Sequence, residues 1–331
     1  MLTVVESGAI PDDAEHLLSR TPFDVSATWF RTVAATAVPP GCRPFFLVVS
    51  DNGRPVALWP MLMHAAGAMS LTCPYTCHYA PASADLSAVR VVGAALRRWG
   101  VVCLEALDSD RIDDIAPGLR AAGLLVLRYD HFGNWHEPAP DWPSYLASRP
   151  GPLRETIRRR LRAVADGRLQ PEFTSTDSAL GAYEEVYRRS WKQPEPFPAF
   201  ASRFLCEAAK AGILRMSVLH YENRPVAAQY WTVEDGVATV LKLAHDESLK
   251  QLSPGTVLTA LTLQRLFEQD RVREIDFGRG DDAYKQLWAS RRRQRTGALV
   301  VNPLHPAGLR AAARHAAGRI ARRIALSRRA K

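Results

Sequence analysis

The segment DFGRGDDAYKQLW, Asp276–Trp288, gathers side chains that exchange protons within a short stretch. Its pattern predicts a buried strand ending at Asp276-Phe277, a glycine-rich turn and a short helix. In that helix Tyr284 and Trp288 are four residues apart and share a face, and Lys285 lies three residues before Trp288. We therefore expect a phenol, an amine and a carboxylate close together at one end of a sheet.

A second segment, residues 237–270, predicts an anion site. It runs from an apolar strand through a polar loop into a helix that begins near Pro254, with Ser253 as a plausible cap. The first turn of a helix offers unpaired N–H groups and the positive end of its dipole, which suits a pyrophosphate. The alternative is an ordinary Ser-Pro helix start. The residues expected to contact the anion are Lys250, Gln251, Ser253, Gly255 and Thr256.

Ser190-Trp191-Lys192, followed by QPEPFPAF, lies between two predicted helices. Trp191 is a candidate wall of an acceptor pocket, and Lys192 could reach an acidic group on a substrate or cofactor. A tight loop around a buried tryptophan is the competing interpretation, and both can hold.

The length and composition predict two packed domains. The chain has 331 residues, of which 47% are hydrophobic. The N-terminal residues do not resemble a signal peptide, and no apolar run approaches the ~20 residues needed to span a membrane. Five scattered cysteines argue against a disulfide framework, so we expect a cytoplasmic location.

The net charge of +9 is concentrated at the C-terminus. Residues 291–331 hold twelve Arg or Lys and no Asp or Glu, whereas the first 290 residues hold 31 basic and 34 acidic residues. The tail 304–331 also has apolar residues at helical spacing. Contact with an anionic lipid, contact with RNA such as tRNA, and a merely solvated helix all fit this basic amphipathic tail.

An internal repeat predicts the architecture. FFLVVSDNGRPVALWPM (Phe45–Met61) and RMSVLHYENRPVAAQYWTV (Arg215–Val233) each indicate a β-hairpin with a polar turn followed by Arg-Pro-Val-Ala. A helical stretch and a strand follow both, with similar spacing. We expect an α/β (mixed) fold of two lobes, each a central mixed sheet flanked by helices, at residues 1–150 and 151–303, followed by the tail.

The second lobe, from about Arg154 to Asn302, resembles the CelD/BcsL family of GNAT-like acyltransferases, which is related to the FemAB-type aminoacyl transferases with two such lobes. The matching features are the Arg-rich entry helix, Ser190-Trp191-Lys192, the Arg-Pro-Val-Ala hairpin, the Ser-Pro-Gly helix start and DFGRGDDAYKQLW. The resemblance implies two tandem GNAT-like lobes and transfer of an acyl group from acyl-CoA, or a carrier thioester, to an amine.

The resemblance also implies roles for individual residues. Tyr284 is where GNAT enzymes have the tyrosine that protonates the departing CoA thiolate, and a phenol of pKa about 10 can do this for a thiol of pKa about 8.5. The N–H groups near Leu243 and Ala244 would polarise the thioester carbonyl. The loop from Gln251 to Thr256 would hold the CoA pyrophosphate, although it is one residue longer than the family pattern and lacks its second glycine.

An amine nucleophile must also lose a proton. His245, with Asp246 beside it, is best placed along the chain to accept that proton, and Asp276 is the alternative. We group Lys285 with the catalytic residues, and Asp281 and Trp288 with Trp191 and Lys192 as substrate contacts. Asp276 and Asp281 could instead only order the glycine turn.

The same sequence features also bear on the role of the first lobe, on the acceptor and on other classes of function. The first lobe has LEALDSDRIDDIAPGL in place of DFGRGDDAYKQLW, so we expect it to be structural or substrate-shaping. The acceptor is expected to be a small amine, an amino sugar or an amino acid. An aminoacyl-tRNA donor and a non-catalytic envelope or polysaccharide-synthesis protein are the alternatives. Cys73, Cys77 and His78 have no second ligand cluster, so no metal is expected.

Overall fold

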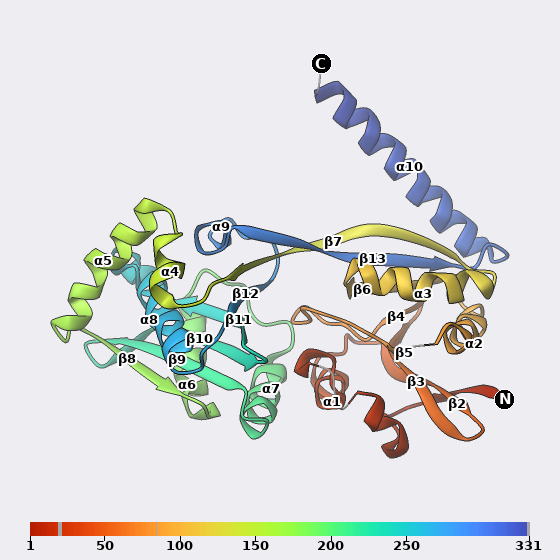
Figure 1. The fold of residues 1–331 in the computed structure, drawn as a ribbon, viewed down its shortest axis with the longest axis horizontal. Helices are drawn as coiled ribbons and strands as arrows, with labels where there is room; N and C mark the ends of the chain where they lie inside the picture. The colour runs from red at the N-terminus through yellow and green to blue at the C-terminus, as the bar shows by residue number, and fades with distance from the viewer. Residues whose placement is uncertain (19–21, 84, 330–331) are drawn as a thin grey trace. The chain divides into compact units, whose positions relative to one another are not determined.

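The computed structural model describes residues 1–18, 22–83 and 85–329, and its fold is mixed α/β as expected (Figure 1). The chain forms two compact units. Unit 1 comprises Met1–Phe132 and Gln294–Lys331, and unit 2 comprises Gly133–Arg293.

Unit 1 contains a mixed sheet in the order β1-β2-β3-β4-β6-β13. Neighbouring strands are antiparallel except for β4 and β6, which are parallel. A short strand, β5, pairs with β3. The bounds of these strands are β1 Leu2–Ser7, β2 Arg43–Asp51, β3 Arg54–His64, β4 Gly67–Ser70, β5 Ala82–Ser83, β6 Val101–Leu107 and β13 Arg291–Val301.

Helices α2 and α3 of unit 1 pack closely on each other. A Cβ atom on Gly93 of α2 would lie 2.7 Å from the Cβ of Ala122, and one on Gly118 of α3 would lie 2.7 Å from the Cβ of Val89. Glycine at both positions therefore permits this approach of the two backbones. The helices of unit 1 are η1 Asp12–Leu17, η2 Phe23–Val25, α1 Ala27–Thr36, α2 Leu86–Leu96, α3 Ser109–Ala121 and α10 Pro306–Arg329.

Unit 2 contains a sheet in the order β7-β12-β11-β10-β9-β8, in which only β11 and β12 are parallel neighbours. The same sequence of pairings occurs in unit 1, so the two units share one plan. The strand bounds are β7 Leu125–Pro138, β8 Leu169–Thr174, β9 Leu214–Tyr221, β10 Arg224–Glu234, β11 Val237–His245 and β12 Glu274–Arg279.

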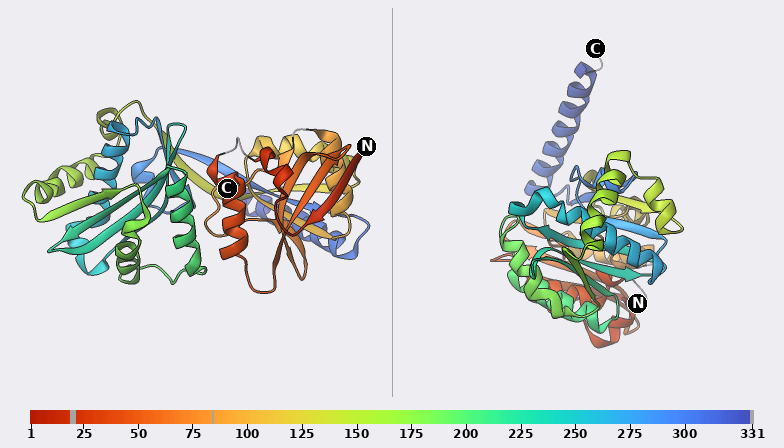
Figure 2. Two further views of the ribbon diagram at one scale, coloured as in Figure 1. Left: turned by 90° about the horizontal axis from the view of Figure 1, so that it is seen from below. Right: turned by 90° about the vertical axis from the view of Figure 1, so that its left-hand side faces the viewer.

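Helices cover both faces of the unit 2 sheet (Figure 2). Successive side chains of a strand point to opposite faces. On β10, Gln229 Nε2 donates to the hydroxyl of Thr259 on α8 at 2.6 Å, whereas the neighbouring Tyr230 packs against Tyr183 of α6 and Phe204 of α7. The helices are α4 Trp142–Ala147, α5 Gly151–Ala165, η3 Asp177–Ala179, α6 Leu180–Arg188, α7 Pro198–Lys210, η4 Glu247–Leu252, α8 Pro254–Glu268 and α9 Lys285–Trp288.

The repeated Arg-Pro-Val-Ala sequence has the same effect in both units. Opposite β2, Pro55 pairs with Ser50 and Ala57 with Val49, which leaves Val56 as an extra residue. Val226 is likewise the extra residue between Pro225 and Ala227 in β10. Because proline supplies no N–H to the ladder, a bulge beside it disturbs pairing the least.

Both hairpin turns also use left-handed backbone. Asn52 and Gly53 have φ of 47° and 82°, and Glu222 and Asn223 have φ of 51° and 59°. Two successive residues with positive φ match the right-handed twist of the flanking strands. The predicted hairpins are therefore confirmed in both units, with the same turn and the same bulge.

The boundaries of the two units differ from the boundaries expected for the two lobes. The second half of β7 pairs with β12, so residues 133–150 belong to unit 2. β13 pairs with β6, so residues 294–303 belong to unit 1, together with the tail. Boundaries at 150 and 303 follow the linear order of the motifs. They cannot represent β7 and β13, because each of these strands is divided between the two units.

A buried ion pair fixes the end of β7 in unit 2. Arg149 Nη2 lies 2.7 Å from Glu137 Oε1, and the side chains are 2% and 10% exposed. The other oxygen of Glu137 accepts hydrogen bonds from the N–H and hydroxyl of Ser290, at 2.6 and 2.7 Å. Losing one partner would leave the other charge buried and uncompensated.

We expect Arg149→Met to lower the free energy of unfolding by about 3–5 kcal/mol, because it strands the Glu137 carboxylate. The matched control is Arg158→Met, which breaks an exposed pair with Glu155 and should cost less than about 1 kcal/mol. Urea unfolding followed by circular dichroism measures both. Equal losses in the two variants would contradict the structural role of the buried pair.

Candidate active site

β11 and β12 separate soon after they meet. Their parallel pairing covers only the pairs from Val237–Glu274 to Thr239–Asp276, although β11 continues to His245 and β12 to Arg279. A bulge at Leu241 shifts the register of β11 against β10 at the same level. Beyond the last pair, the facing strand edges have backbone N–H and C=O groups available to a ligand.

The corresponding separation in unit 1 is filled by the chain itself. β4 and β6 pair only through Ala68–Val102 and Met69–Cys103. The N–H of Tyr79 then donates to the backbone oxygen of Ala106 on β6 at 2.8 Å, and the fully buried Tyr79 hydroxyl donates to the oxygen of Pro60. This segment occupies the edge of β6 that a ligand would need.

The first turn of α8 lies next to His245, at the end of β11. A Cβ atom on Gly255 would lie 3.1 Å from His245 Nδ1. The first turn contains no acidic residue, so the positive end of the helix dipole is not neutralised there. Ser253 does not cap the helix with its side chain as expected, because its backbone is left-handed, with φ of 54° and ψ of 46°.

Gly255 and Thr256 are half-buried residues of this turn, and Lys250 and Gln251 are exposed in η4 before it. The first intrahelical bond is donated by Val257 to the oxygen of Ser253. The N–H groups that precede it have no partner within the helix. The turn is therefore suited to an anion, with Lys250 near it in the chain.

His245 has a neutral imidazole in a largely apolar setting. Its ring centroid lies 4.5 Å from that of Trp191, and its Nε2 lies 3.2 Å from Glu247. Burial lowers its pKa, against the opposing effect of Glu247. Its Nδ1 is buried and has no hydrogen-bond partner among the described residues. An imidazole of this kind can accept a proton.

Lys192 places an ammonium between two aromatic rings. Its Nζ lies 5.7 Å from the ring centroid of Trp191 and 5.9 Å from that of Tyr187. Burial, and next the charge of Lys242, lower its pKa to about 8. No carboxylate lies within ion-pair distance of Lys192 in the part of the chain that the structure describes.

Electrostatic interactions connect these residues with the glycine turn. The titration of Lys192 is affected by Asp282 and Lys285 of the turn segment, and that of His245 by Lys192. The loop after α6, the end of β11, the start of α8 and the turn segment therefore lie within electrostatic or contact reach of one another. Trp191 forms a partly open wall there, with 49% of its surface exposed.

Tyr284 immediately precedes α9 and is half-buried. Burial, assisted by the negative charge of Asp282, raises its pKa, so the phenol keeps its proton at neutral pH. Within the described residues its hydroxyl has no hydrogen-bond partner. Tyr284 is thus an available proton donor.

Lys285 does not have the free amine that a catalytic role needs. It is 3% exposed, and its Nζ donates to the backbone oxygens of Arg279 and Gly280 at 2.6 and 3.3 Å. Asp282 lies 3.2 Å from the same nitrogen. The ammonium therefore holds the glycine turn in place.

Asp276, the alternative base, is also used structurally. Its carboxylate accepts hydrogen bonds from Asn134 Nδ2 at 2.6 Å and the N–H of Gly278 at 2.7 Å, and it pairs with Arg293 at 2.5 Å. A buried carboxylate already engaged by three donors has little room to contact a substrate.

The two other residues expected to contact substrate have structural partners. Asp281 pairs with Arg292 at 2.6 Å and accepts from the indole of Trp135 at 3.0 Å, and these donors lower its pKa, Arg292 most. Trp288 is buried in the core, and its backbone oxygen accepts the hydroxyl of Tyr145. Both residues therefore help to hold α9 and the glycine turn in place.

Leu243 and Ala244 cannot both donate to the separation. They pair with Gln229 and Ala228 of β10. Adjacent residues of a strand direct their N–H groups to opposite edges, so only one of the two can face away from β10. Either one supplies a single backbone donor at this level of β11.

Three residues that the sequence analysis missed surround Lys192. Lys242 Nζ lies 2.6 Å from Glu195, and the Tyr187 hydroxyl donates to the oxygen of Gln193 at 2.7 Å. Burial raises the pKa of Tyr187 to about 12. In the sequence, the one feature that could have indicated this group is Lys242, a charged residue in the largely apolar strand VATVLKLAH.

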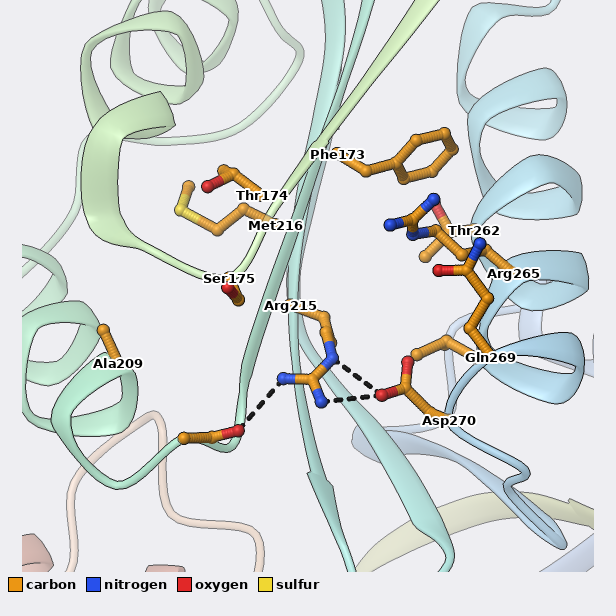
Figure 3. Close-up of a pocket in the computed structure, with 12 residues that line it drawn as sticks. Phe173, Thr174, Ser175, Ala209, Arg215, Met216, Thr262, Arg265, Gln269 and Asp270 are labelled. Atoms are coloured by element: carbon orange, nitrogen blue, oxygen red, sulfur yellow. Dashed lines mark hydrogen bonds and ion pairs between the residues drawn. The ribbon is translucent and has the colours of Figure 1, made fainter.

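A cavity of about 560 Å³ opens between the end of β8 and α8 (Figure 3). Arg215 donates to Asp270 at 2.6 and 2.9 Å and to the oxygen of Gly212, and Arg265 lies over the ring of Phe173. Its one carboxylate is held by an arginine, and none of the predicted site residues is among the described residues that line it. It is therefore not the candidate active site.

Two further observations concern the described residues only. No group of three His, Cys, Asp or Glu side chains is arranged to hold a metal ion. His78, one of the possible ligands in the sequence, lies instead 3.1 Å from Asp108. No helix in the described ranges has the length and apolar character needed to cross a membrane.

Residues 152–286 match the family model described as "Acetyltransferase (GNAT) domain". This range contains the separation of β11 and β12, the start of α8 and Tyr284. No curated protein matches the sequence.

Several solved structures share the fold of most of the chain. FemX is 9% identical, with 90% of this chain and 98% of FemX covered and a TM-score of 0.61. L-PGS from Bacillus licheniformis is 12% identical, with coverages of 89% and 92% and a TM-score of 0.55. A tandem GNAT protein from the clavulanic acid biosynthesis pathway is 14% identical, with coverages of 91% and 98% and a TM-score of 0.53.

Residues 152–286 are thus similar to the GNAT acetyltransferase domain, and most of the chain shares its fold with FemX and with the tandem GNAT protein. The domain match supports a transferase activity for residues 152–286. At these identities the structural likeness shows the fold alone.

We expect Lys192 to react with acetic anhydride at a rate that rises up to about pH 8 and then levels off, because only the neutral amine is nucleophilic. Lys210, whose pKa is raised by its hydrogen bond to Glu207, should keep gaining reactivity through pH 10. Short labelling pulses, read by peptide mass spectrometry and normalised to a small competing amine, measure both rates. Parallel pH profiles would contradict the environment described for Lys192.

Proposed function

We propose that this protein transfers an acyl group from acyl-CoA, or from an acyl-carrier thioester, to an amine, and that the reaction takes place where β11 and β12 separate. The observation that carries the proposal is the separation of β11 and β12 in unit 2. The start of α8 and the protonated phenol of Tyr284 belong to the same unit. The filled counterpart in unit 1 argues for a single site in the chain.

The donor would bind along the open strand edge. The pantetheine arm of CoA carries amide groups, which can pair with the N–H and C=O groups that β11 leaves free beyond Thr239. Its pyrophosphate would lie at the N–H groups of Gly255 and Thr256, with Lys250 and Gln251 as additional contacts. One N–H from Leu243 or Ala244 would then polarise the thioester carbonyl.

The chemical step would be direct attack. The amine nitrogen bonds to the thioester carbon, the C–S bond breaks, and the CoA thiolate takes the proton of Tyr284. His245 would accept the proton that the amine loses, since its imidazole is neutral and its Nδ1 has no described partner. Solvent would return a proton to Tyr284 and remove one from His245.

The acceptor would enter past Trp191. Its ring is half exposed and contacts His245, so it can orient an amine toward that base. Lys192, which lacks an ion-pair partner among the described residues, would bind an acidic group of an amino acid or a substituted amino sugar, or of the donor. The assignment to the CelD/BcsL type belongs to this proposal and rests on the motif residues of unit 2.

The alternative donor is an aminoacyl-tRNA. The basic C-terminal segment favours it, because residues 291–331 carry twelve cationic side chains and no acidic residue, which suits binding to a phosphate backbone. Binding measurements distinguish the donors. Saturable binding of CoA supports the leading proposal, whereas salt-sensitive tRNA binding without CoA binding supports the alternative.

We expect Tyr284→Phe to lower kcat on the order of 10²-fold, with little change in the affinity for CoA, because it removes the proton donor and keeps the ring. Release of CoA thiol across a panel of amines measures the rate. The matched control is Tyr129→Phe, which removes a half-buried phenol from unit 1, where its hydroxyl contacts Cys103, and should leave the rate unchanged. A folded Tyr284→Phe protein with full activity would contradict the assigned role.

Gly255→Glu should weaken the binding of CoA at least tenfold, because it adds a negative charge at the helix start and presses on the His245 ring. Gly181→Glu introduces the same charge in the first turn of α6, where a Cβ meets open space, and should leave CoA binding intact. Isothermal titration calorimetry with CoA compares the two. Unchanged affinity in Gly255→Glu would locate the pyrophosphate away from α8.

A further inference from the structure

Unit 1 contains a cavity of about 530 Å³ between the start of α10 and the strands β4, β6 and β13. This volume suits one drug-sized ligand. The cavity lies outside the acyl-transfer site proposed for unit 2, so a ligand bound in it would not depend on that proposed reaction.

The cavity exists because α10 is anchored close to the sheet and presents small residues to it. A Cβ atom on Gly308 would lie 2.1 Å from the backbone oxygen of Asn302, so only glycine permits this approach. Asn302 is itself tied down, because its Nδ2 donates to the oxygen of Arg97 at 2.7 Å. Ala307 and Ala311, one turn apart, then leave room above the sheet.

The inner wall is apolar and the mouth is cationic. Val101 of β6 and Leu299 of β13 line the wall, together with alanines of β4 and α10. Arg310 and Arg314 are exposed residues of α10 that also line the cavity, and neither has an ion-pair partner among the described residues. No acidic residue is among the described residues that line it.

Two imidazoles also line the cavity. His315 has a buried Nε2 without a hydrogen-bond partner in the described ranges, and His64 accepts the N–H of Ala66 through Nδ1. An unpartnered buried nitrogen beside two unpaired guanidinium groups favours a ligand that brings hydrogen-bond acceptors with negative charge.

We propose that this cavity binds one long-chain fatty-acid carboxylate, with the alkyl chain along Val101, Leu299 and the alanines and the carboxylate between Arg310 and Arg314. Arginine recognises a carboxylate with two parallel hydrogen bonds, and each buried methylene adds to the affinity. A phospholipid has two chains and a larger head group, so a single-chain amphiphile fits the volume better.

Calorimetric titration of the full chain with decanoate, laurate and myristate, each below its critical micelle concentration, tests the proposal. One equivalent should bind, with an affinity that rises about fourfold for each added methylene. Tetradecyltrimethylammonium, which has the same chain as myristate and the opposite charge, should bind at least tenfold more weakly. Equal binding of the two amphiphiles would overturn the proposal.

Variants test each half of the cavity. Ala311→Phe fills the apolar part, and Arg310→Gln with Arg314→Gln removes the charge; each should weaken myristate binding at least tenfold, with circular dichroism unchanged. The control pair Arg90→Gln with Arg120→Gln removes two exposed charges from α2 and α3 and should bind as the parent does. If the charge variant lost binding to anionic vesicles or tRNA while myristate never bound, α10 would be a charged surface only, and the cavity assignment would be wrong.

Discussion

The early end of the pairing between β11 and β12 is the constraint on which the rest of unit 2 depends. Only three residue pairs join these parallel strands before they separate. Every strand edge opened in this way must find partners from water, from a ligand or from the protein itself. The bulge at Leu241, the left-handed Ser253 and the glycine turn at Gly278 all occur at the level of this opening.

The two units resolve the same constraint differently. In unit 1 the segment that contains Tyr79 pairs with the edge of β6, and a fully buried ring fills the space. In unit 2 the loop after β11 instead leads directly into η4 and α8, and the polar residues stay near the opening. The two units therefore share one plan and differ at this position, which the chain itself closes in unit 1 and leaves open in unit 2.

Several charged side chains of unit 2 have structural partners that hold them in place. The carboxylates of Asp276 and Asp281 are held by Arg293 and Arg292, and the ammonium of Lys285 is held by backbone oxygens. These groups fix the glycine turn and α9. The side chains of Lys192 and Tyr284 have no such partner among the described residues, and His245 keeps an unpartnered Nδ1 although its Nε2 lies 3.2 Å from Glu247. These are the groups that the proposed function assigns to the reaction. Supporting residues of this kind keep reacting side chains in position.

The sequence by itself determined the local elements. The Arg-Pro-Val-Ala hairpins, the helix starting at Pro254 and the strand ending near Asp276 follow from periodicity, turn residues and proline, which act over a few residues. For the same reason the repeat predicted two lobes of one plan. The position of Tyr284 just after the strand and the turn is local as well, whereas its role came from the family resemblance and stays a proposal.

Tertiary structure alone decided which charged residues are free. Asp276, Asp281 and Lys285 look as reactive in the sequence as Tyr284 does, and their partners Arg293, Arg292 and the oxygen of Arg279 become neighbours only through folding. The ends of the units were decided in the same way, since β7 and β13 each divide between two units. Pairings between residues far apart in the chain leave no periodic signal in the sequence, so only the packed fold determines them.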